Sequence, residues 1–261
     1  WVLTTVDGTK YYFGLGKRYS ADTLDTKSTL TVPVAGNQSG EPGYKSGDFA
    51  GSFLTQAWRW NLDYVVDVHG NTMTYVYSKA TNRYRQSATA KSVAYDRDSW
   101  LTRIEYGQRK GSEATTTAPA RVSFTTAERC VPTADFDCAA SNLTSANAAK
   151  WPDVPFDQIC TSTTDCGLTR TAPTFFTRKR LTAVTTQVLS GTSYTDVDSW
   201  ALAQKFPQSG DGTSPSLWLS SITQTGKVGG TVTLPAVTFG GTQLPNRVAG
   251  LDGSEPLYKW R

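Results

Sequence analysis

The chain has 261 residues, and its 26 Lys and Arg against 22 Asp and Glu leave a net charge of only +4 at pH 7. Lys and Arg are scattered, which excludes the clustered basic surface of a typical nucleic-acid-binding domain, and we interpret the one tight basic run, at 178–180, as a solvated strand end. No apolar stretch approaches the ~20 residues of a membrane-spanning helix. A hydrophobic fraction of 38%, with 12 Tyr and 8 Trp, favours a sheet protein that has one wet face.

The first half of the chain predicts a series of hairpins. Residues 1–19 form a hairpin that turns at Asp7-Gly8, since Asp and Gly suit tight turns. Residues 20–52, rich in Ser, Thr, Gly and Asp, are expected to be a long insertion. Residues 53–107 predict a meander with turns at 67–71, 79–82 and 96–99.

Two phrases of this meander share a pattern in which a polar turn leads into an alternating strand. They are DVHGNTMTYVY at 67–77 and YDRDSWLTRIEYG at 95–107. Because alternate residues of a strand face the same way, we predict one buried sheet face made by the large residues of both strands. Its members are Tyr75, Tyr77, Trp100, Ile104 and Tyr106.

The second half begins with 108–119, whose Gly, Ser, Thr and Pro predict a flexible linker. Strands are expected at 120–126, 175–188, 199–206, 218–225 and 230–239, and a short helix only at 141–150. Tight turns between alternating strands indicate an antiparallel meander. The predicted fold class is therefore all-β, with about a dozen strands and a disulfide-containing loop insertion.

The four cysteines lie as two close pairs, Cys130 with Cys138 and Cys160 with Cys166. Four cysteines allow three connectivities, of which we favour the two local pairs, although cross-linking of the two loops is also feasible. Zinc sites more often use C-x2–4-C spacings, so disulfides, and with them an oxidising extracellular compartment, are the preferred interpretation over zinc or free thiols.

The search for catalytic residues finds no convincing constellation, and we predict no enzyme, no cofactor and no metal site. His69 is the only histidine, so any triad would need it, yet it lies in a predicted turn. Carboxylate pairs for hydrolysis are possible in principle at Asp63 with Asp67 or at Asp135 with Asp137. Aspartates near the cysteines lack the regular series of a calcium loop; they are Asp135, Asp137, Asp153, Asp157 and Asp165.

The two phrases resemble the tyrosine–aspartate (YD, or RHS) repeats of bacterial RHS proteins and teneurins. The segments WVLTTVDGTKYYFG at 1–14 and WRWNLDYVVD at 58–67 look like the Salmonella virulence plasmid B-type segment that precedes such repeats in insecticidal toxin-complex proteins. The resemblance covers residues 1–110, and 180–248 share its strand–turn rhythm. Residues 128–170 match nothing in the pattern, and Ser99 stands where the repeat usually has Gly.

This resemblance implies three regions: a virulence plasmid B-like/YD-repeat meander at 1–110, a linker and cysteine-rich insertion at 111–172, and further RHS-like strands at 173–261. It implies a structural, non-catalytic segment of a large secreted or cell-surface bacterial protein of the polymorphic-toxin kind. The β-shell of such a protein encloses a C-terminal toxin or effector, so the implied partners are the rest of the parent polypeptide and this cargo.

Two other functions remain open at this stage. Exposed tryptophans could make the chain an extracellular carbohydrate- or cell-surface-binding β module that uses the segments 20–52 and 128–170. A hydrolase that uses loop carboxylates is the third alternative. Neither nucleic acid nor a membrane span is expected.

Overall fold

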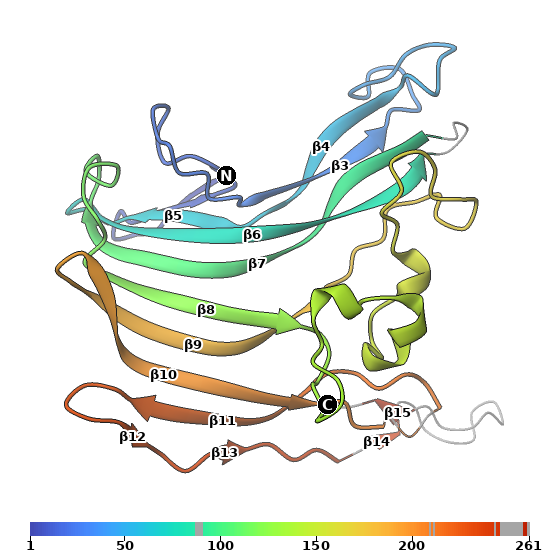
Figure 1. Ribbon diagram of the computed structural model, residues 1–261. Helices are drawn as coiled ribbons and strands as arrows, with labels where there is room; N and C mark the ends of the chain where they lie inside the picture. The colour runs from blue at the N-terminus through green and yellow to red at the C-terminus, as the bar shows by residue number, and fades with distance from the viewer. Residues whose placement is uncertain (87–90, 209, 211, 243, 246–257, 260–261) are drawn as a thin grey trace. The chain divides into compact units, whose positions relative to one another are not determined.

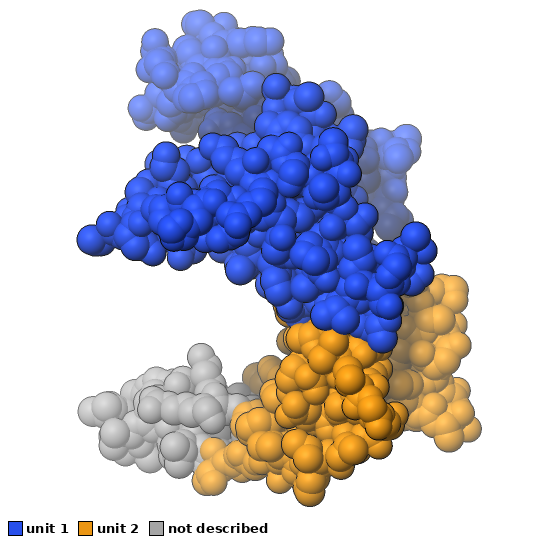
Figure 2. Space-filling model, turned by 90° about the vertical axis from the view of Figure 1, so that its left-hand side faces the viewer, with its two compact units in different colours: residues 1–123, 157–177, 187–195 blue, residues 124–156, 178–186, 196–261 orange. Residues whose placement is uncertain are grey.

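The computed structural model describes residues 1–86, 91–208, 210, 212–242, 244–245 and 258–259. Parts of the third predicted region, at 246–257 and 260–261, lie outside these described residues. The chain divides into two compact units, coloured separately in Figure 2. Unit 1 comprises residues 1–123, 157–177 and 187–195, and unit 2 comprises 124–156, 178–186 and 196–261.

The described residues are almost entirely strand, turn and loop, which confirms the predicted all-β class (Figure 1). The strands are β1 Val2–Thr4, β2 Lys10–Phe13, β3 Thr29–Ala35, β4 Phe53–Trp60, β5 Leu62–Val66, β6 Asn71–Gln86, β7 Lys91–Arg109, β8 Ala120–Glu128, β9 Lys179–Ser190, β10 Ser193–Lys205, β11 Trp218–Gly226, β12 Val232–Thr233, β13 Val237–Thr238, β14 Leu244–Pro245 and β15 Tyr258–Lys259. Three short 3₁₀ helices are η1 Ala140–Asn142, η2 Ser145–Lys150 and η3 Phe156–Gln158.

The sheet of unit 1 has the order β1-β2-β5-β6-β7, with the first residues of β8 beside β7. All these pairs are antiparallel. The predicted turn at Asp7-Gly8 joins β1 to β2, and Gly8 has the positive φ of 85° that such a turn favours. The predicted turn at 67–71 is also present, where the Asp67 carboxylate accepts hydrogen bonds from the backbone N–H groups of His69 and Asn71.

The turns predicted at 79–82 and 96–99 are wrong, because both segments lie inside one long hairpin of β6 and β7 (Figure 1). Their polar residues face each other across the ladder, with Lys79 opposite Ser99 and Thr81 opposite Asp96. Lys79 Nζ lies 3.0 Å from the Asp96 carboxylate. Cross-strand pairing therefore satisfies the groups that looked like turn formers, and Arg97 is an extra residue in a β-bulge.

The predicted buried face is also wrong, and a second bulge explains part of the error. Tyr75 pairs with Ile104, but Val76 pairs with Arg103 and Tyr77 with Leu101, so Thr102 is an extra residue. The extra residue reverses the alternation of β7 and places Trp100 opposite Ser78. None of the five predicted residues is buried; all are half-exposed.

The segment 20–52 is less irregular than expected, because it contains β3. β3 pairs with β4 to form a separate two-stranded sheet, in which Leu30 is fully buried. Val32 of this sheet packs with Tyr84 and Tyr95 of the β6–β7 hairpin, and Trp58 lies against the same cluster. The hydrophobic core of unit 1 thus lies between two hairpins rather than under the centre of the larger sheet.

Unit 2 contains the remainder of β8 with most of β9 and β10, followed by β11, β12 and β13. β11 pairs along its length with residues 198–205 of β10, as the predictions at 199–206 and 218–225 require, whereas 230–239 forms only the two-residue strands β12 and β13 on β11. The predicted helix at 141–150 is replaced by η1 and η2. β9 begins at Lys179, so Phe175 and Phe176 precede the strand that was expected to include them.

Candidate functional site

The residues that could have served in catalysis are held in turns and in buried contacts of their own. His69 is exposed in the turn between β5 and β6. Asp63 is completely buried, and its Oδ2 accepts hydrogen bonds from Gly16 N and from the hydroxyls of Thr26 and Ser28 at 2.7–2.9 Å. Asp67 is occupied by its own turn. Asp63 therefore anchors a loop and Asp67 forms a turn, so the two carboxylates do not face a common substrate.

The aspartates around the cysteines also have separate partners. Asp137 accepts from Ala139 N and from the Asn142 side chain, Asp153 pairs with Arg129, and Asp165 pairs with Arg85. Asp135 is exposed. Among the described residues, no three His, Cys, Asp or Glu side chains gather as they would around a metal ion.

One face of the unit 1 sheet, called here the covered face, is closed by two loops. Its buried side chains are polar and hydrophobic in equal number: Tyr64, Val66, Thr72, Thr74, Val76 and Gln108. The loop at 110–119 is ordered against this face, since the Tyr64 hydroxyl donates to the Glu113 carboxylate and Gln108 Nε2 donates to Thr116 O at 2.5 Å. The loop at 14–28 adds Arg18 and Asp22, which form an almost fully buried ion pair with a shortest distance of 2.6 Å.

The pKa shifts of Asp22 and Tyr64 favour the protonation states that hold the two loops on the covered face. The hydrogen bond from Arg18, together with those from the backbone N–H groups of Leu24 and Arg18, lowers the pKa of Asp22 to about 2 against the opposing effect of burial. Burial, and then the hydrogen bond to Glu113, raises the pKa of the Tyr64 hydroxyl above its usual value. Tyr64 therefore remains a neutral donor to Glu113, and Asp22 remains a charged acceptor for Arg18.

The opposite face of the same sheet is apolar and only half covered, and we call it the open face. Cross-strand pairs place Tyr11, Val65, Met73 and Tyr106 in one row, and Tyr75, Ile104 and Val122 in the next. All of these side chains are half-exposed or exposed, with Met73 at 36%. Contiguous apolar surface of this kind usually marks a site where something else packs.

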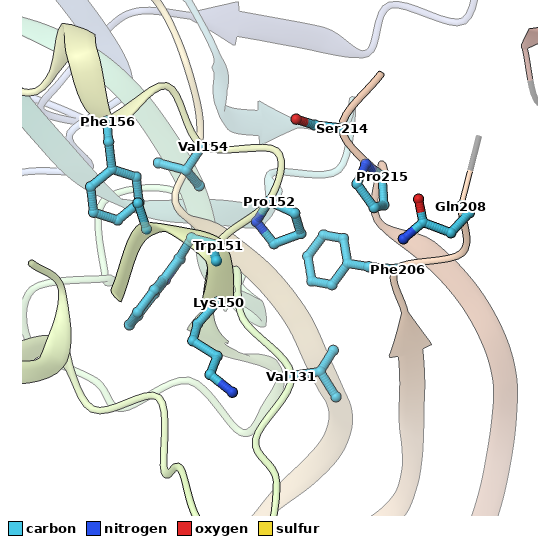
Figure 3. Close-up of a pocket in the computed structure, with 12 residues that line it drawn as sticks. Val131, Lys150, Trp151, Pro152, Val154, Phe156, Phe206, Gln208, Ser214 and Pro215 are labelled. Atoms are coloured by element: carbon cyan, nitrogen blue, oxygen red, sulfur yellow. The ribbon is translucent and has the colours of Figure 1, made fainter. Parts of the chain in front are cut away.

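Unit 2 contains a hollow of about 630 Å³ beside its 3₁₀ helices (Figure 3). Its lining is mainly apolar, with Val131, Trp151, Pro152, Val154, Phe206 and Pro215. Figure 3 shows the rings of Pro152 and Phe206 next to each other. Lys150, Gln208 and Ser214 are its polar lining residues, so the hollow has room for an apolar group but no carboxylate, imidazole or thiol for chemistry.

The four cysteines form two disulfides, each within its own loop: Cys130–Cys138 in unit 2 and Cys160–Cys166 in unit 1. This is the local pairing of the sequence analysis. Disulfides persist in oxidising compartments, and no helix in the described part of the chain is long and apolar enough to cross a membrane.

The basic run at 178–180 is not the solvated strand end that its charge suggested. Arg178 and Lys179 both pair with the buried Glu128 carboxylate, at 3.2 and 2.7 Å. Arg180 donates to the backbone oxygens of Glu128 and Cys130. The run therefore ties β9 to β8 and to the first disulfide loop within unit 2.

No family model matches the chain, and no curated protein matches it. Among solved structures, a search finds the crystal structure of TcdB2-TccC3, at 12% identity and a TM-score of 0.40 over 93% of this chain and 12% of that chain. It also finds the N-terminal domain of the effector protein SpvB from Salmonella typhimurium strain LT2, at 13% identity and a TM-score of 0.42 over 87% of this chain and 60% of that one. The chain thus spans about an eighth of the first relative's length.

Proposed function

We propose that this chain is a non-catalytic wall segment of a larger secreted RHS/YD-type protein. The observation that carries the proposal is the open face, where rows of aromatic and aliphatic side chains cross five strands without a covering layer among the described residues. A sheet that leaves such a face half-exposed is incomplete as a globular core, because burial of apolar area is the main stabilising contribution in folding.

The edge of the sheet supports the same proposal. Among the strands that the structure describes, β1 pairs only with β2, and its side chains Val2 and Leu3 are 58% and 55% exposed. An uncovered strand edge is a template for pairing with a further strand. The sequence resemblance suggests what would cover these surfaces: neighbouring strands of the parent polypeptide at the edge, and an enclosed toxin or effector against the open face.

Labelling of introduced cysteines tests the proposal. Met73→Cys places a thiol on the open face, and Val68→Cys, which is 62% exposed in the wild type, places a control thiol in the nearby turn. Both should react with a maleimide in the isolated chain. In the longer polypeptide, Met73→Cys should react at least about tenfold more slowly while Val68→Cys is unchanged. Equal reaction at both positions in the longer polypeptide would contradict the wall segment.

A second candidate, an extracellular carbohydrate- or cell-surface-binding module, is favoured by one observation. Trp1 and Trp60 are 77% and 40% exposed, and their rings meet at 89° with centroids 5.9 Å apart. Exposed indoles of this kind can stack on a ligand. Binding of the isolated chain to a glycan array, lost in Trp60→Ala and kept in Trp100→Ala, would support this candidate instead.

A further inference from the structure

The β3–β4 hairpin has one edge bonded to the β6–β7 hairpin and one open edge (Figure 1). Thr31 N of β3 donates to the Asp96 carboxylate at 2.9 Å, and the Tyr84 hydroxyl donates to Pro33 O at 3.4 Å. The outward backbone groups of β3 therefore have partners on β6 and β7. By contrast, β4 pairs with no strand other than β3 within the described residues.

The register identifies the backbone groups at the open edge of β4. In an antiparallel pair, a residue whose N–H and C=O point outward lies opposite a residue whose groups also point outward. Thr55 lies opposite Pro33, and Phe53 lies two residues before Thr55. Gly36 N donates to Ser52 O at 2.8 Å, which continues the same alternation. The N–H and C=O groups of Phe53 and Thr55 thus point outward, and no hydrogen bond of theirs is found in the described part of the chain.

This edge lacks the features that usually keep strand edges from pairing. The sequence over 53–57 is FLTQA, with no charged residue and no proline. The β-bulge of the hairpin lies beyond this stretch, at Trp58. Native sheets blunt their open edges with lysine, proline or bulges, and an edge without them is a template for a further strand.

An apolar hollow of about 490 Å³ adjoins the hairpin. Val34, Pro42 and Phe49 form its apolar wall, and Val34 and Phe49 are 39% and 46% exposed. Gln56 of β4 also lines it and lies on the same face as Val34, because Val34 pairs with Leu54, two residues from Gln56. A strand paired along β4 presents every second side chain to this face, so one of them can enter the hollow.

Glu41 gives the hollow a negative charge. It is the only charged residue in the lining, and its Oε2 accepts from the backbone N–H groups of Asn37 and Gln38 at 2.7 and 3.1 Å. These bonds fix the carboxylate, and no cationic partner of Glu41 is found among the described residues. A basic side chain two positions from the apolar one lies on the same face of an added strand, where it can pair with this carboxylate.

We propose that the open edge of β4 is a docking site for an extended segment of a separate protein. The segment adds a third strand, places an apolar side chain in the hollow and places a lysine or arginine beside Glu41. In strand addition of this kind, backbone pairing supplies affinity and side-chain pockets supply selectivity. The occupant is a separate protein because β3 and β4 form a sheet of their own, so a strand added there does not extend the large sheet of the wall segment.

Labelled peptides test the site on the intact, oxidised chain. The probe has about eight residues, enough for an average strand of ~5–6, and valine alternates with threonine except that one lysine replaces a valine. Fluorescence anisotropy should show saturable binding. Two matched peptides carry N-methyl groups on one or the other set of alternate residues. Only one set faces β4, so one peptide should bind at least about tenfold more weakly and the other should bind as before.

Two variants of the chain test the edge and the hollow separately. Thr55→Pro removes an outward N–H without removing a bond to β3, and it should weaken binding at least about tenfold, whereas Thr55→Val should not. Glu41→Gln keeps an acceptor for Asn37 N and Gln38 N but removes the charge. It should weaken binding of the lysine peptide about threefold and leave a peptide with glutamine in that position unchanged. The methylated peptides remain decisive if Thr55→Pro does not fold.

Four results would overturn the proposal. The first is no saturable binding of the lysine peptide up to ~1 mM. The second is an equal loss for both methylated peptides, and the third is an unchanged affinity in Glu41→Gln. The fourth is binding that the isolated chain shows and the longer polypeptide lacks, which would mean that the parent polypeptide itself covers the edge.

Discussion

The two faces of the unit 1 sheet reverse the usual distribution of side chains, because polar residues are buried on one face and apolar residues are half-exposed on the other. The covered face buries Thr72, Thr74 and Gln108 beneath loops held by Asp63 and Glu113, whereas the open face leaves Tyr106 and its apolar neighbours half-exposed. The comparison teaches that loops with specific polar partners, rather than apolar side chains alone, determine which face of this sheet is closed. Gln108 and Glu113 can do so because each buried polar group that loses its partner is costly, whereas the Thr72 and Thr74 hydroxyls have no hydrogen-bond partner among the described residues.

The largest expected effect is the loss of the covered face's anchor. Asp63→Ala removes the acceptor for Gly16 N and for the hydroxyls of Thr26 and Ser28, of which the two hydroxyl residues are fully buried. We expect the free energy of unfolding to fall by about 3–5 kcal/mol, because the buried Thr26 and Ser28 hydroxyls and Gly16 N all lose their acceptor. Urea unfolding measures this, with Asp67→Ala in the exposed turn as the control that should lose less. Equal losses would mean that the loop at 14–28 does not depend on Asp63.

The ion pair of the covered face should make stability depend on acid. The folded pKa of Asp22 is about 2 and its ordinary value is 3.8, so its contribution is present above pH 3.8 and is lost as the pH falls through about 2. The shift corresponds to about 2 kcal/mol. Urea unfolding at pH 5 and at pH 2 should show this loss, and Asp22→Asn should show a correspondingly smaller one. An identical pH dependence in both proteins would contradict it.

Substitution of Trp100 tests whether this side chain belongs to the buried core. The bulge at Thr102 places it opposite Ser78, and it is half-buried. Trp100→Ala should therefore cost about 1–3 kcal/mol, less than the 3–5 kcal/mol of a fully buried aromatic residue. Thermal unfolding would measure it. A loss at the upper end of the buried range would show that Trp100 belongs to the core after all.

The open face should give the smallest effect on stability. Met73→Thr with Tyr106→Thr replaces two neighbours of one row by a good strand former. The isolated chain should lose no more than about 1 kcal/mol, because little buried apolar area is removed. Binding of an apolar fluorescent dye should decrease at the same time. A loss of several kcal/mol would mean that this face is already a core.

The sequence predicted the fold class, the turn at Asp7-Gly8, the turn at 67–71 and the local cysteine pairs, since each depends on residues close together in the chain. It could not predict that Lys79 and Asp96 would pair across a hairpin, because turn-forming residues and cross-strand polar pairs have the same composition. Nor could it predict the bulges at Arg97 and Thr102, each of which shifts the register by one residue.

The covered face was missed for a related reason. Thr72 and Thr74 alternate with Met73 and Tyr75, and the apolar set was expected to be buried. The deciding partners, Glu113 and Asp22, lie in segments that composition assigned to a linker and to an insertion. Their contacts with the sheet are long-range, and a single sequence contains no direct signal for them.

From β6 to β8, each strand lies beside the strand that precedes it in the chain. A chain with this order can build its sheet in the direction of synthesis, since every new strand finds its partner already formed and no long loop has to close first. We therefore expect this part of unit 1 to assemble progressively from its N-terminal side. Interrupting the chain after β7 should leave a paired β5–β6–β7 ladder, whereas removing β6 should leave its neighbours without a template.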